Sequence, residues 1–328
     1  MEMLLKDIIY KGIETISVQY PEKEAREMVF AYMEDVFGIR KYDHILGPDR
    51  TLTQEQTLRA LADFGRMASG EPLQYVTGKA HFYGRQFRVT PDVLIPRQET
   101  ELLCKDVLLV SDSQSGYSPR ILDLCTGSGC IAWTFALEMP GTQVTAVDIS
   151  EGALKVASSQ DFGEEISRTG ALKPIFIKAD VLKGPENCLE LYEGPDSEQS
   201  LTGSSEPSQP VSPDFPKYDI IVSNPPYVMD SEKASMRTNV LDHEPHLALF
   251  VPDDDPLKFY LAVSAWASAL LKEEGVGIVE INEALGKETA DIFRESGFIY
   301  TEVIRDLHEK DRFVRFSRSP FPKKIDFF

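Results

Sequence analysis

The stretch that decides the fold runs over residues 122–131 and reads Leu-Asp-Leu-Cys-Thr-Gly-Ser-Gly-Cys-Ile. Its apolar start predicts a buried strand over 121–124, and Gly127 and Gly129 stand where this strand turns into a helix that begins at Ile131. Glycine lets the backbone approach a ligand closely, and a helix start supplies free N–H groups. The stretch therefore predicts a ligand-binding turn at the carboxyl end of a strand.

Asp148 closes the next predicted strand, over 144–147, about 20 residues beyond the glycines. A carboxylate at this point can accept hydrogen bonds from both hydroxyls of a ribose. The alternative is a helix N-cap, because Ser150 and Glu151 follow. Together with the glycine turn, Asp148 favours an adenosine-containing ligand.

Strands and helices alternate through the rest of the chain. Strands are predicted at 121–124, 144–147, 175–177, 220–222 and 276–281, with helices beginning at Ile131, Glu151, Pro256 and Leu285. Such alternation is typical of an α/β fold with a mainly parallel sheet. Asp180 and Val181 follow the third of these strands, and chain order alone places them where they would contact an adenine.

A second polar segment, Asn224-Pro225-Pro226-Tyr227, directly follows the apolar run over 218–223. The two prolines fix successive φ angles and remove two backbone donors. The amide oxygen of Asn224 and the carbonyl of Pro225 could each accept one N–H of a planar NH2 group, with the Tyr227 ring against its plane. The alternative is a proline turn that merely ends the strand.

In the regions before the predicted sheet, apolar residues recur at other spacings. Apolar residues at helical spacing over 4–16, 21–37 and 53–67 predict an amino-terminal helical domain over 1–77. Such a bundle is either a module that recognises a macromolecule or a structural cap, and the sequence favours recognition. Alternating residues around Tyr83-Gly84 predict a β-hairpin linker and lead-in helix over 78–117. The catalytic domain is expected over 118–328, interrupted at 184–216 by a flexible acidic insertion rich in Ser, Pro and Gly.

The composition of the chain limits the kinds of partner that are expected. The 328 residues carry a formal net charge of -19, which opposes binding to nucleic-acid phosphates and favours a small molecule or a basic protein. No apolar run reaches the ~20 residues that a membrane span needs, so no membrane partner and a cytoplasmic location are expected. The four cysteines include no Cys-x-x-Cys pair and are expected to be reduced. No metal is expected either, because Pro245 breaks any helix face that His243 and His246 could share.

The glycine turn, Asp148 and the Asn224 segment together resemble a class I S-adenosylmethionine-dependent methyltransferase that acts on a planar nitrogen. Further segments resemble the peptide-chain-release-factor glutamine N5-methyltransferases, the PrmC or HemK family: 71–78 (Glu-Pro-Leu-Gln-Tyr-Val-Thr-Gly), 93–101 (Val-Leu-Ile-Pro-Arg-Gln-Glu-Thr-Glu), Glu244-Pro245 and Asp311-Arg312. The resemblance implies a Rossmann-like fold, S-adenosylmethionine as cofactor, and peptide chain release factors as protein substrates. It implies methylation of the glutamine in their Gly-Gly-Gln motif.

The resemblance also implies the site residues. The residues implied for catalysis are Asn224, Pro225, Pro226 and Tyr227. Those implied for cofactor binding are Cys125, Thr126, Gly127, Ser128, Gly129, Asp148, Asp180, Val181 and Asn224. Leu94 is implied to bind the substrate together with the Asn224–Tyr227 segment.

Two positions depart from the family pattern. Cys125 replaces a glycine, which requires a backbone angle that is not reserved for glycine, and Val181 stands where an aromatic ring often covers the adenine. Both departures are expected to loosen cofactor binding.

Other functions fit parts of the sequence. Gly127-x-Gly129-x-x-Ala132 satisfies a relaxed dinucleotide fingerprint, but a dehydrogenase would need an acid or base near the fourth strand, where Asn224 stands instead. Nucleic-acid exocyclic-amine methyltransferases use similar pockets, and the acidic charge argues against them. A ribosomal-protein glutamine methyltransferase shares the Asn-Pro-Pro-Tyr segment. A protein that binds adenosine without catalysis is the remaining alternative.

Overall fold

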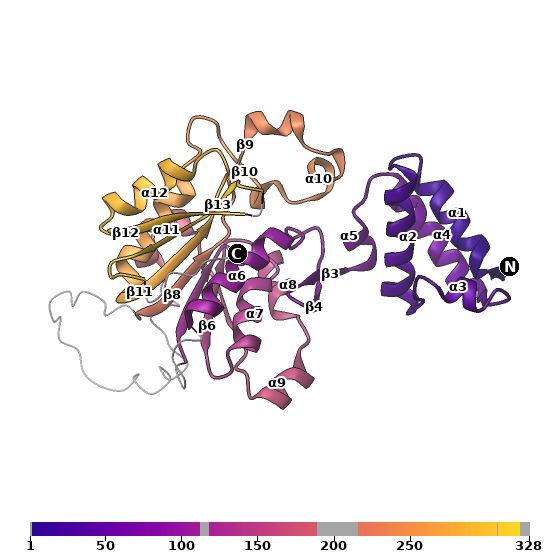
Figure 1. The fold of residues 1–328 in the computed structure, drawn as a ribbon, viewed down its shortest axis with the longest axis horizontal. Coiled ribbons are helices and arrows are strands. Elements are labelled where there is room, and N and C mark those ends of the chain that lie inside the picture. Colours follow the sequence, from indigo (N-terminus) through magenta and orange to yellow (C-terminus); the bar gives the residue numbers. More distant parts are fainter. Residues whose placement is uncertain (1, 112–117, 189–215, 307, 322–328) are drawn as a thin grey trace, which may run out of the picture.

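The computed structural model describes residues 2–111, 118–188, 216–306 and 308–321. Its centre is a seven-stranded sheet in the order β12-β13-β11-β8-β5-β6-β7 (Figure 1). The strands are β5 (Arg120–Leu124), β6 (Gln143–Asp148), β7 (Ile175–Lys178), β8 (Tyr218–Ser223), β11 (Leu271–Glu280), β12 (Tyr300–Arg305) and β13 (Asp311–Ser317). Only β13 runs antiparallel to its neighbours within this described sheet. The predicted α/β fold with a mainly parallel sheet is confirmed. Most of the expected insertion, 189–215, lies outside the described residues.

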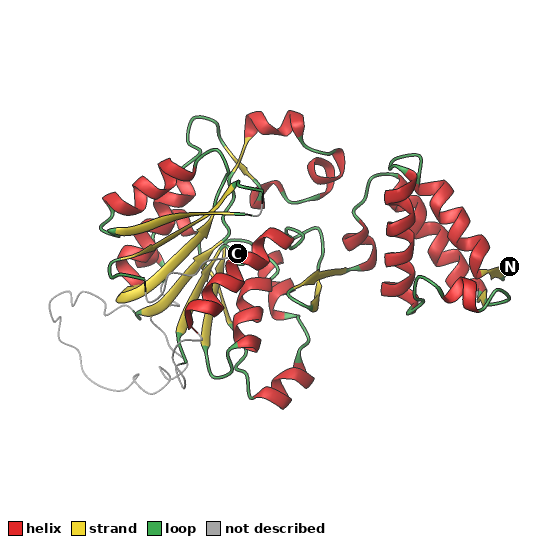
Figure 2. Cartoon of the chain, viewed as in Figure 1, coloured by secondary structure: helices red, strands yellow, loops and turns green. Residues whose placement is uncertain are grey.

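The sheet is buried on both faces because successive side chains of a strand point to opposite sides. Leu122 and Leu124 of β5 pack in one hydrophobic cluster with Trp266, whereas Ile121 packs in another with Trp133. Helices cover the two faces (Figure 2): α6 (Gln98–Ser111) and α7 (Cys130–Glu138) on one, α11 (Lys258–Leu270) and α12 (Gly286–Glu295) on the other. The structure is therefore three-layered.

Shorter elements connect these layers. They are α8 (Glu151–Ser158) and α9 (Gly163–Thr169) around the edge near β7, and β9 (Val228–Met229), α10 (Thr238–His243) and β10 (Phe250–Val251) after β8. β9 and β10 pair in parallel and form a small separate sheet. None of the helices in the described part of the chain is long and apolar enough to cross a membrane.

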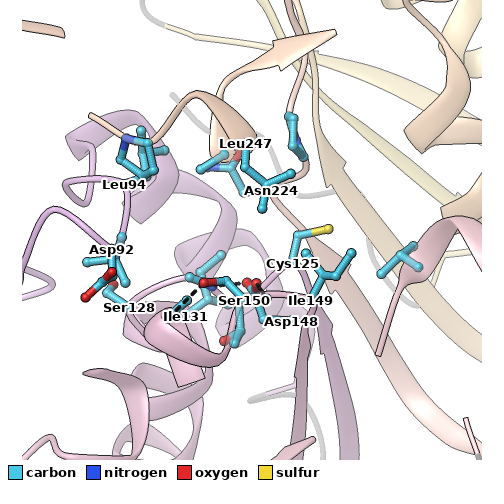
Figure 3. A pocket seen from close by; sticks show the side chains of 18 of the residues that line it. Asp92, Leu94, Cys125, Ser128, Ile131, Asp148, Ile149, Ser150, Asn224 and Leu247 are labelled. Carbon is cyan, nitrogen blue, oxygen red and sulfur yellow. Dashed lines mark hydrogen bonds between the residues drawn. The ribbon is translucent and has the colours of Figure 1, made fainter. Parts of the chain in front are cut away.

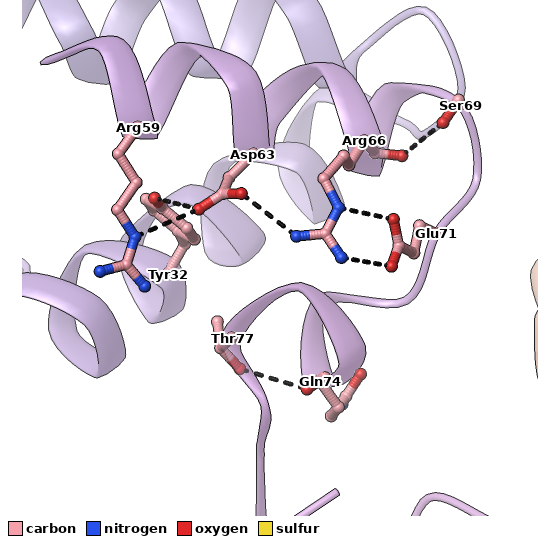
Figure 4. Close-up of polar contacts among 8 residues, drawn as sticks. All are labelled: Tyr32, Arg59, Asp63, Arg66, Ser69, Glu71, Gln74 and Thr77. Atoms are coloured by element: carbon pink, nitrogen blue, oxygen red, sulfur yellow. Dashed lines mark hydrogen bonds and ion pairs between the residues drawn. The ribbon is translucent and has the colours of Figure 1, made fainter. Parts of the chain in front are cut away.

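The amino-terminal helices form a bundle with a core of its own. They are α1 (Leu5–Ile16), α2 (Glu22–Phe37), α3 (Asp43–Leu46), α4 (Gln54–Ala68) and α5 (Leu73–Thr77), with β1 (Met3–Leu4) paired to β2 (Thr51–Leu52). Thr53 caps α4 through a reciprocal capping box with Gln56. Inside the bundle, buried Asp63 accepts hydrogen bonds from the Tyr32 hydroxyl (2.7 Å) and from Arg66 (3.3 Å), as Figure 4 shows.

A β-hairpin follows the bundle. β3 (Lys79–Phe82) and β4 (Arg85–Arg88) are joined by Tyr83 and Gly84, both with positive φ, as a tight hairpin turn requires. The Tyr83 backbone N–H donates to the Glu101 carboxylate over 2.9 Å, which holds the turn against α6. The segment between β4 and α6 is thereby placed beside the sheet.

Candidate active site

The two loops that the sequence singles out follow adjacent strands. Leu124 and Ser223, the last residues of β5 and β8, are paired, and the Ser223 hydroxyl donates to the Leu124 carbonyl over 2.8 Å. The strand order reverses here, because β6 lies on the other side of β5. Ligands of open α/β sheets bind in the crevice at such a point. Cys125 and Asn224 therefore begin neighbouring loops where a ligand is expected.

A cavity of about 200 Å³ lies at this crevice (Figure 3). Most of the predicted site residues line it: Leu94, Cys125, Thr126, Gly127, Ser128, Asp148, Asp180, Val181, Asn224 and Pro226. In Figure 3, Asn224 and Leu94 lie toward one end, Asp148 and Ser150 toward the other, with Cys125 between them. The structure thus brings the two predicted halves of the site into one space.

Asp148 forms the polar end of the cavity. Its carboxylate accepts the backbone N–H of Gly127 (2.8 Å) on one oxygen and that of Ser150 (2.9 Å) on the other. Ser150, not Asp148, caps helix α8 by accepting the Ala153 N–H. Burial raises the pKa of Asp148, and the backbone hydrogen bonds oppose that rise. Each oxygen keeps a lone pair that can accept a ribose hydroxyl.

The two glycines of the turn have different reasons to be glycine. Gly127 has φ +56, and a Cβ there would meet nothing within 4 Å, so the space beside it is open. Gly129 has φ +77, and a Cβ would lie 3.0 Å from the Ala157 side chain and 3.2 Å from Trp133. Gly129 does not line the cavity. Its contact with the cofactor stays a prediction, and the close packing of helices α7 and α8 beside it explains why the position is glycine.

Cys125 has a backbone angle of the kind reserved for glycine. Its φ is +62, in the left-handed region. The expectation that a cysteine here avoids such an angle is therefore wrong. A side chain at this angle costs on the order of 1 kcal/mol. Burial raises the pKa of the Cys125 thiol, so the side chain is neutral and lines the cavity.

The segment that follows β7 forms a further wall of the cavity. Asp180 caps the short 3-10 helix Val181–Lys183 by accepting the Leu182 N–H over 3.1 Å. The Val181 carbonyl accepts the indole N–H of buried Trp266 over 2.9 Å, which anchors this segment to α11. Val181 is itself buried and lines the cavity together with Ala179. An apolar wall of this kind suits the flat face of an adenine.

At the opposite end, Asn224 is held through its amide nitrogen, which donates to the Thr100 hydroxyl over 3.1 Å. Pro226 lines the cavity, whereas Pro225 is buried and does not. No hydrogen bond to the Pro225 carbonyl is found within the described residues. Tyr227 also does not line the cavity, because its hydroxyl donates to Glu280 over 3.0 Å. The contact of its ring with the substrate amide stays a prediction.

Two residues of the site were not assigned a role from the sequence. Thr100, at the start of α6, donates its hydroxyl to the Glu280 carboxylate over 2.7 Å, and both side chains are buried. Glu280 ends the apolar strand β11. An acidic residue inside an apolar strand pattern was the available signal, since Glu is rarely buried without a partner.

Two segments meet beside the Asn224 end of the cavity. Arg97 pairs with Glu244 over 2.6 Å, and Glu244 also accepts the Ile95 N–H over 3.2 Å. This pairing joins the segment that carries Leu94 to the loop that carries Leu247, and both leucines line the cavity. The two leucines give this part of the lining apolar surface.

The residues present fit an adenosine-containing cofactor, with acceptor lone pairs at Asp148, open backbone at Gly127 and apolar walls after β7. The strand order, with its inserted antiparallel β13, and this cavity define the class: a Rossmann-like class I methyltransferase.

Comparison with known proteins gives the family. Residues 12–78 match the family model described as the PrmC N-terminal domain. The release factor glutamine methyltransferase of Bacteroides thetaiotaomicron is 36% identical over 299 residues, covering 91% of this chain and 95% of that protein. That of Flavobacterium psychrophilum is 32% identical over 314 residues, covering 95% and 99%. A solved protein-(glutamine-N5) methyltransferase of Alicyclobacillus acidocaldarius is 27% identical, with a TM-score of 0.38 over 71% of this chain and 100% of that chain. The chain belongs to the release factor glutamine methyltransferase family.

Proposed function

We propose that this protein transfers a methyl group from S-adenosylmethionine to the side-chain amide nitrogen N5 of the glutamine in the Gly-Gly-Gln motif of peptide chain release factors. One observation carries the proposal: Asn224 lines the same cavity as Asp148 and Gly127. An acceptor for an amide thus stands beside a place for an adenosine. Family membership over nearly the whole chain supports the choice of release factors as substrate.

When bound, S-adenosylmethionine supplies a methyl group activated by a positive sulfonium. Asp148 binds the ribose hydroxyls, and the backbone beside Gly127 leaves room for the ligand. Asp180 and Val181 flank the adenine. Thr126 and Ser128 line the cavity between these contacts, and Cys125 lies next to Asn224's loop. These residues hold the donor at the carboxyl ends of β5 and β6.

The protein substrate needs orientation, because an amide nitrogen has its lone pair delocalised into the carbonyl and is a poor nucleophile. The Asn224 oxygen and the Pro225 carbonyl accept the two amide hydrogens, which turns the nitrogen toward the methyl group. Pro226 keeps the loop rigid. Leu94 packs on the aliphatic part of the glutamine. The proton that the nitrogen must lose leaves to water.

The amino-terminal bundle, residues 1–77, is proposed as the substrate-recognition domain, with 78–117 as linker and 118–328 as the methyltransferase domain. A net charge of -19 supports a protein partner rather than direct binding to nucleic acid. Location in the cytoplasm, where release factors act, is part of the same proposal.

The test is a transfer assay with labelled S-adenosylmethionine and purified release factors, followed by mass spectrometry of the tryptic peptides. A single added methyl on the glutamine of Gly-Gly-Gln is expected, and a release factor with that glutamine changed to alanine should acquire none. Methylation of a ribosomal protein alone would instead assign the ribosomal-protein activity. Methylation of DNA or RNA alone would refute the choice of a protein substrate.

A further inference from the structure

Asn224 belongs to a chain of hydrogen bonds that joins three segments distant in sequence and is buried at its centre. Its amide nitrogen donates to Thr100 (3.1 Å), Thr100 donates to one oxygen of Glu280 (2.7 Å), and Tyr227 donates to the other (3.0 Å). Thr100 and Glu280 are each only 2% exposed. Solvent therefore does not compete for the central bond between Thr100 and Glu280.

The chemistry of these groups fixes the direction of every bond. Each oxygen of the Glu280 carboxylate accepts one hydroxyl, from Thr100 and from Tyr227, so the single hydrogen of the Thr100 hydroxyl goes to Glu280. The hydroxyl then has only lone pairs left for Asn224, which must present its N–H to Thr100 rather than its oxygen. The Asn224 oxygen is left for the cavity that this residue lines.

The direction matters because an asparagine amide has nearly the same shape in its two flipped orientations. With the oxygen toward the cavity, Asn224 accepts an N–H of the substrate amide. With the nitrogen toward the cavity, two donors would face each other and the substrate amide would be turned away. We propose that Thr100, oriented by Glu280, is a positioning residue that selects the accepting orientation of Asn224. This inference rests on the proposed function.

Packing alone does not account for the network. A residue that only fills space at the end of β11 needs no charge, and burying a carboxylate has a desolvation cost unless it is hydrogen-bonded. Burial raises the pKa of Glu280, and the hydrogen bonds from the Thr100 and Tyr227 hydroxyls oppose that rise. The two hydroxyls, one on each carboxylate oxygen, place Glu280 as the acceptor of both bonds.

The kinetic test compares Thr100→Val, which keeps the shape and removes the hydroxyl, with Thr100→Ser, which restores it. Thr134→Val is the matched control, because Thr134 is equally buried, lies outside the cavity and bonds only the Cys130 carbonyl. We expect kcat to fall at least ~10-fold in Thr100→Val, with the donor Kd within about threefold of wild type. Thr100→Ser should recover kcat to within about threefold. A Thr100→Val enzyme with wild-type kcat, or with equal losses in kcat and donor affinity, overturns the inference.

A second readout does not need catalysis. The sequence contains four asparagines, Asn187, Asn224, Asn239 and Asn282, so selective ¹⁵N-asparagine labelling gives four side-chain amide signals. Asn224→Asp assigns the relevant one, and Asn282, which is also hydrogen-bonded, serves as internal reference. Hydrogen exchange of the Asn224 amide should be at least ~10-fold faster in Thr100→Val, with Asn282 unchanged. Equal exchange overturns the inference.

Glu280→Gln covers the case in which Thr100→Val does not fold. A glutamine fills the same volume but can also donate, so the direction of the Thr100 bond is no longer fixed. We expect faster exchange at Asn224 and at least a threefold loss of kcat, and wild-type values of both would overturn the inference. If the wild-type protein methylates no release factor, the proposed function fails, while the exchange measurement still decides whether Thr100 holds Asn224.

Discussion

Cys125 offers a test of the backbone at the centre of the site. At an ordinary backbone angle, a protein with glycine at a given position is less stable than one with alanine by roughly 0.5–1 kcal/mol, because glycine loses more entropy on folding. At φ +62 the order should reverse, since a Cβ in the left-handed region costs roughly 1–2 kcal/mol. We therefore expect Cys125→Gly to be more stable than Cys125→Ala by about 1 kcal/mol.

The comparison of the two variants is cleaner than a comparison of either with wild type, because both lack the thiol. Cys130 provides the matched control: it begins helix α7 with ordinary angles, so Cys130→Gly should be less stable than Cys130→Ala. The expected difference at Cys125 corresponds to a rise in Tm of about 2–4 °C for a domain of this size. The glycine variant should thus be the more stable of the pair at position 125 and the less stable of the pair at position 130.

The assay is urea unfolding followed by tryptophan fluorescence. The chain has two tryptophans, Trp133 and Trp266, and both are buried against the sheet, so the signal reports the part of the protein that holds the site. Equal midpoints for Cys125→Gly and Cys125→Ala, or a lower midpoint for the glycine variant, would refute the assigned backbone angle.

Two further predictions concern carboxylates. Asp148→Ala should weaken binding of S-adenosylmethionine by at least about 10-fold to 100-fold, measured by calorimetry, because the loss of even one hydrogen bond to a charged group costs roughly 1.5–3 kcal/mol; unchanged affinity would exclude the ribose contact. Burial raises the pKa of Asp123 to about 7, so its contribution to stability is complete below about pH 4 and is lost as the pH rises through 7. The stability of wild type relative to Asp123→Asn should therefore fall between pH 4 and 7 by roughly 2–4 kcal/mol, and a pH-independent difference in urea unfolding would contradict the shifted pKa.

The local sequence pattern was sufficient to predict the sheet and to place the two loops at the same edge of it. Apolar runs marked β5 and β8, and parallel strands bring their carboxyl ends to one edge, so Cys125 and Asn224 were expected at the same edge of the sheet. The direct pairing of β5 with β8, which β6 and β7 separate in sequence, comes from the structure. The strands β12 and β13 were not predicted. Their residues include Glu302, Arg312 and Arg315, and the burial of Arg315 depends on its ion pair with Asp106, which is distant in sequence.

The details of the site depend on tertiary contacts, which the spacing of residues in the sequence does not reveal. Gly129 is glycine because of Ala157 and Trp133, and its positive φ cannot be distinguished in sequence from that of Gly127. Tyr227 is turned away from the cavity by Glu280, 53 residues further along the chain. Residue types thus predicted which segments form the site, whereas tertiary hydrogen bonds decided which side chains face it.

The proposed role of Asn224, alignment of the substrate amide, requires it to contribute far more to turnover than to binding of the donor. This role is tested most directly by measuring kcat for release-factor methylation and the donor Kd in Asn224→Ala, with Asn239→Ala, a residue outside the cavity, as control. We expect kcat to fall about 10²-fold or more in Asn224→Ala, with the donor Kd within about threefold of wild type and the control unchanged. Near-normal turnover, or a loss confined to donor affinity, would contradict it.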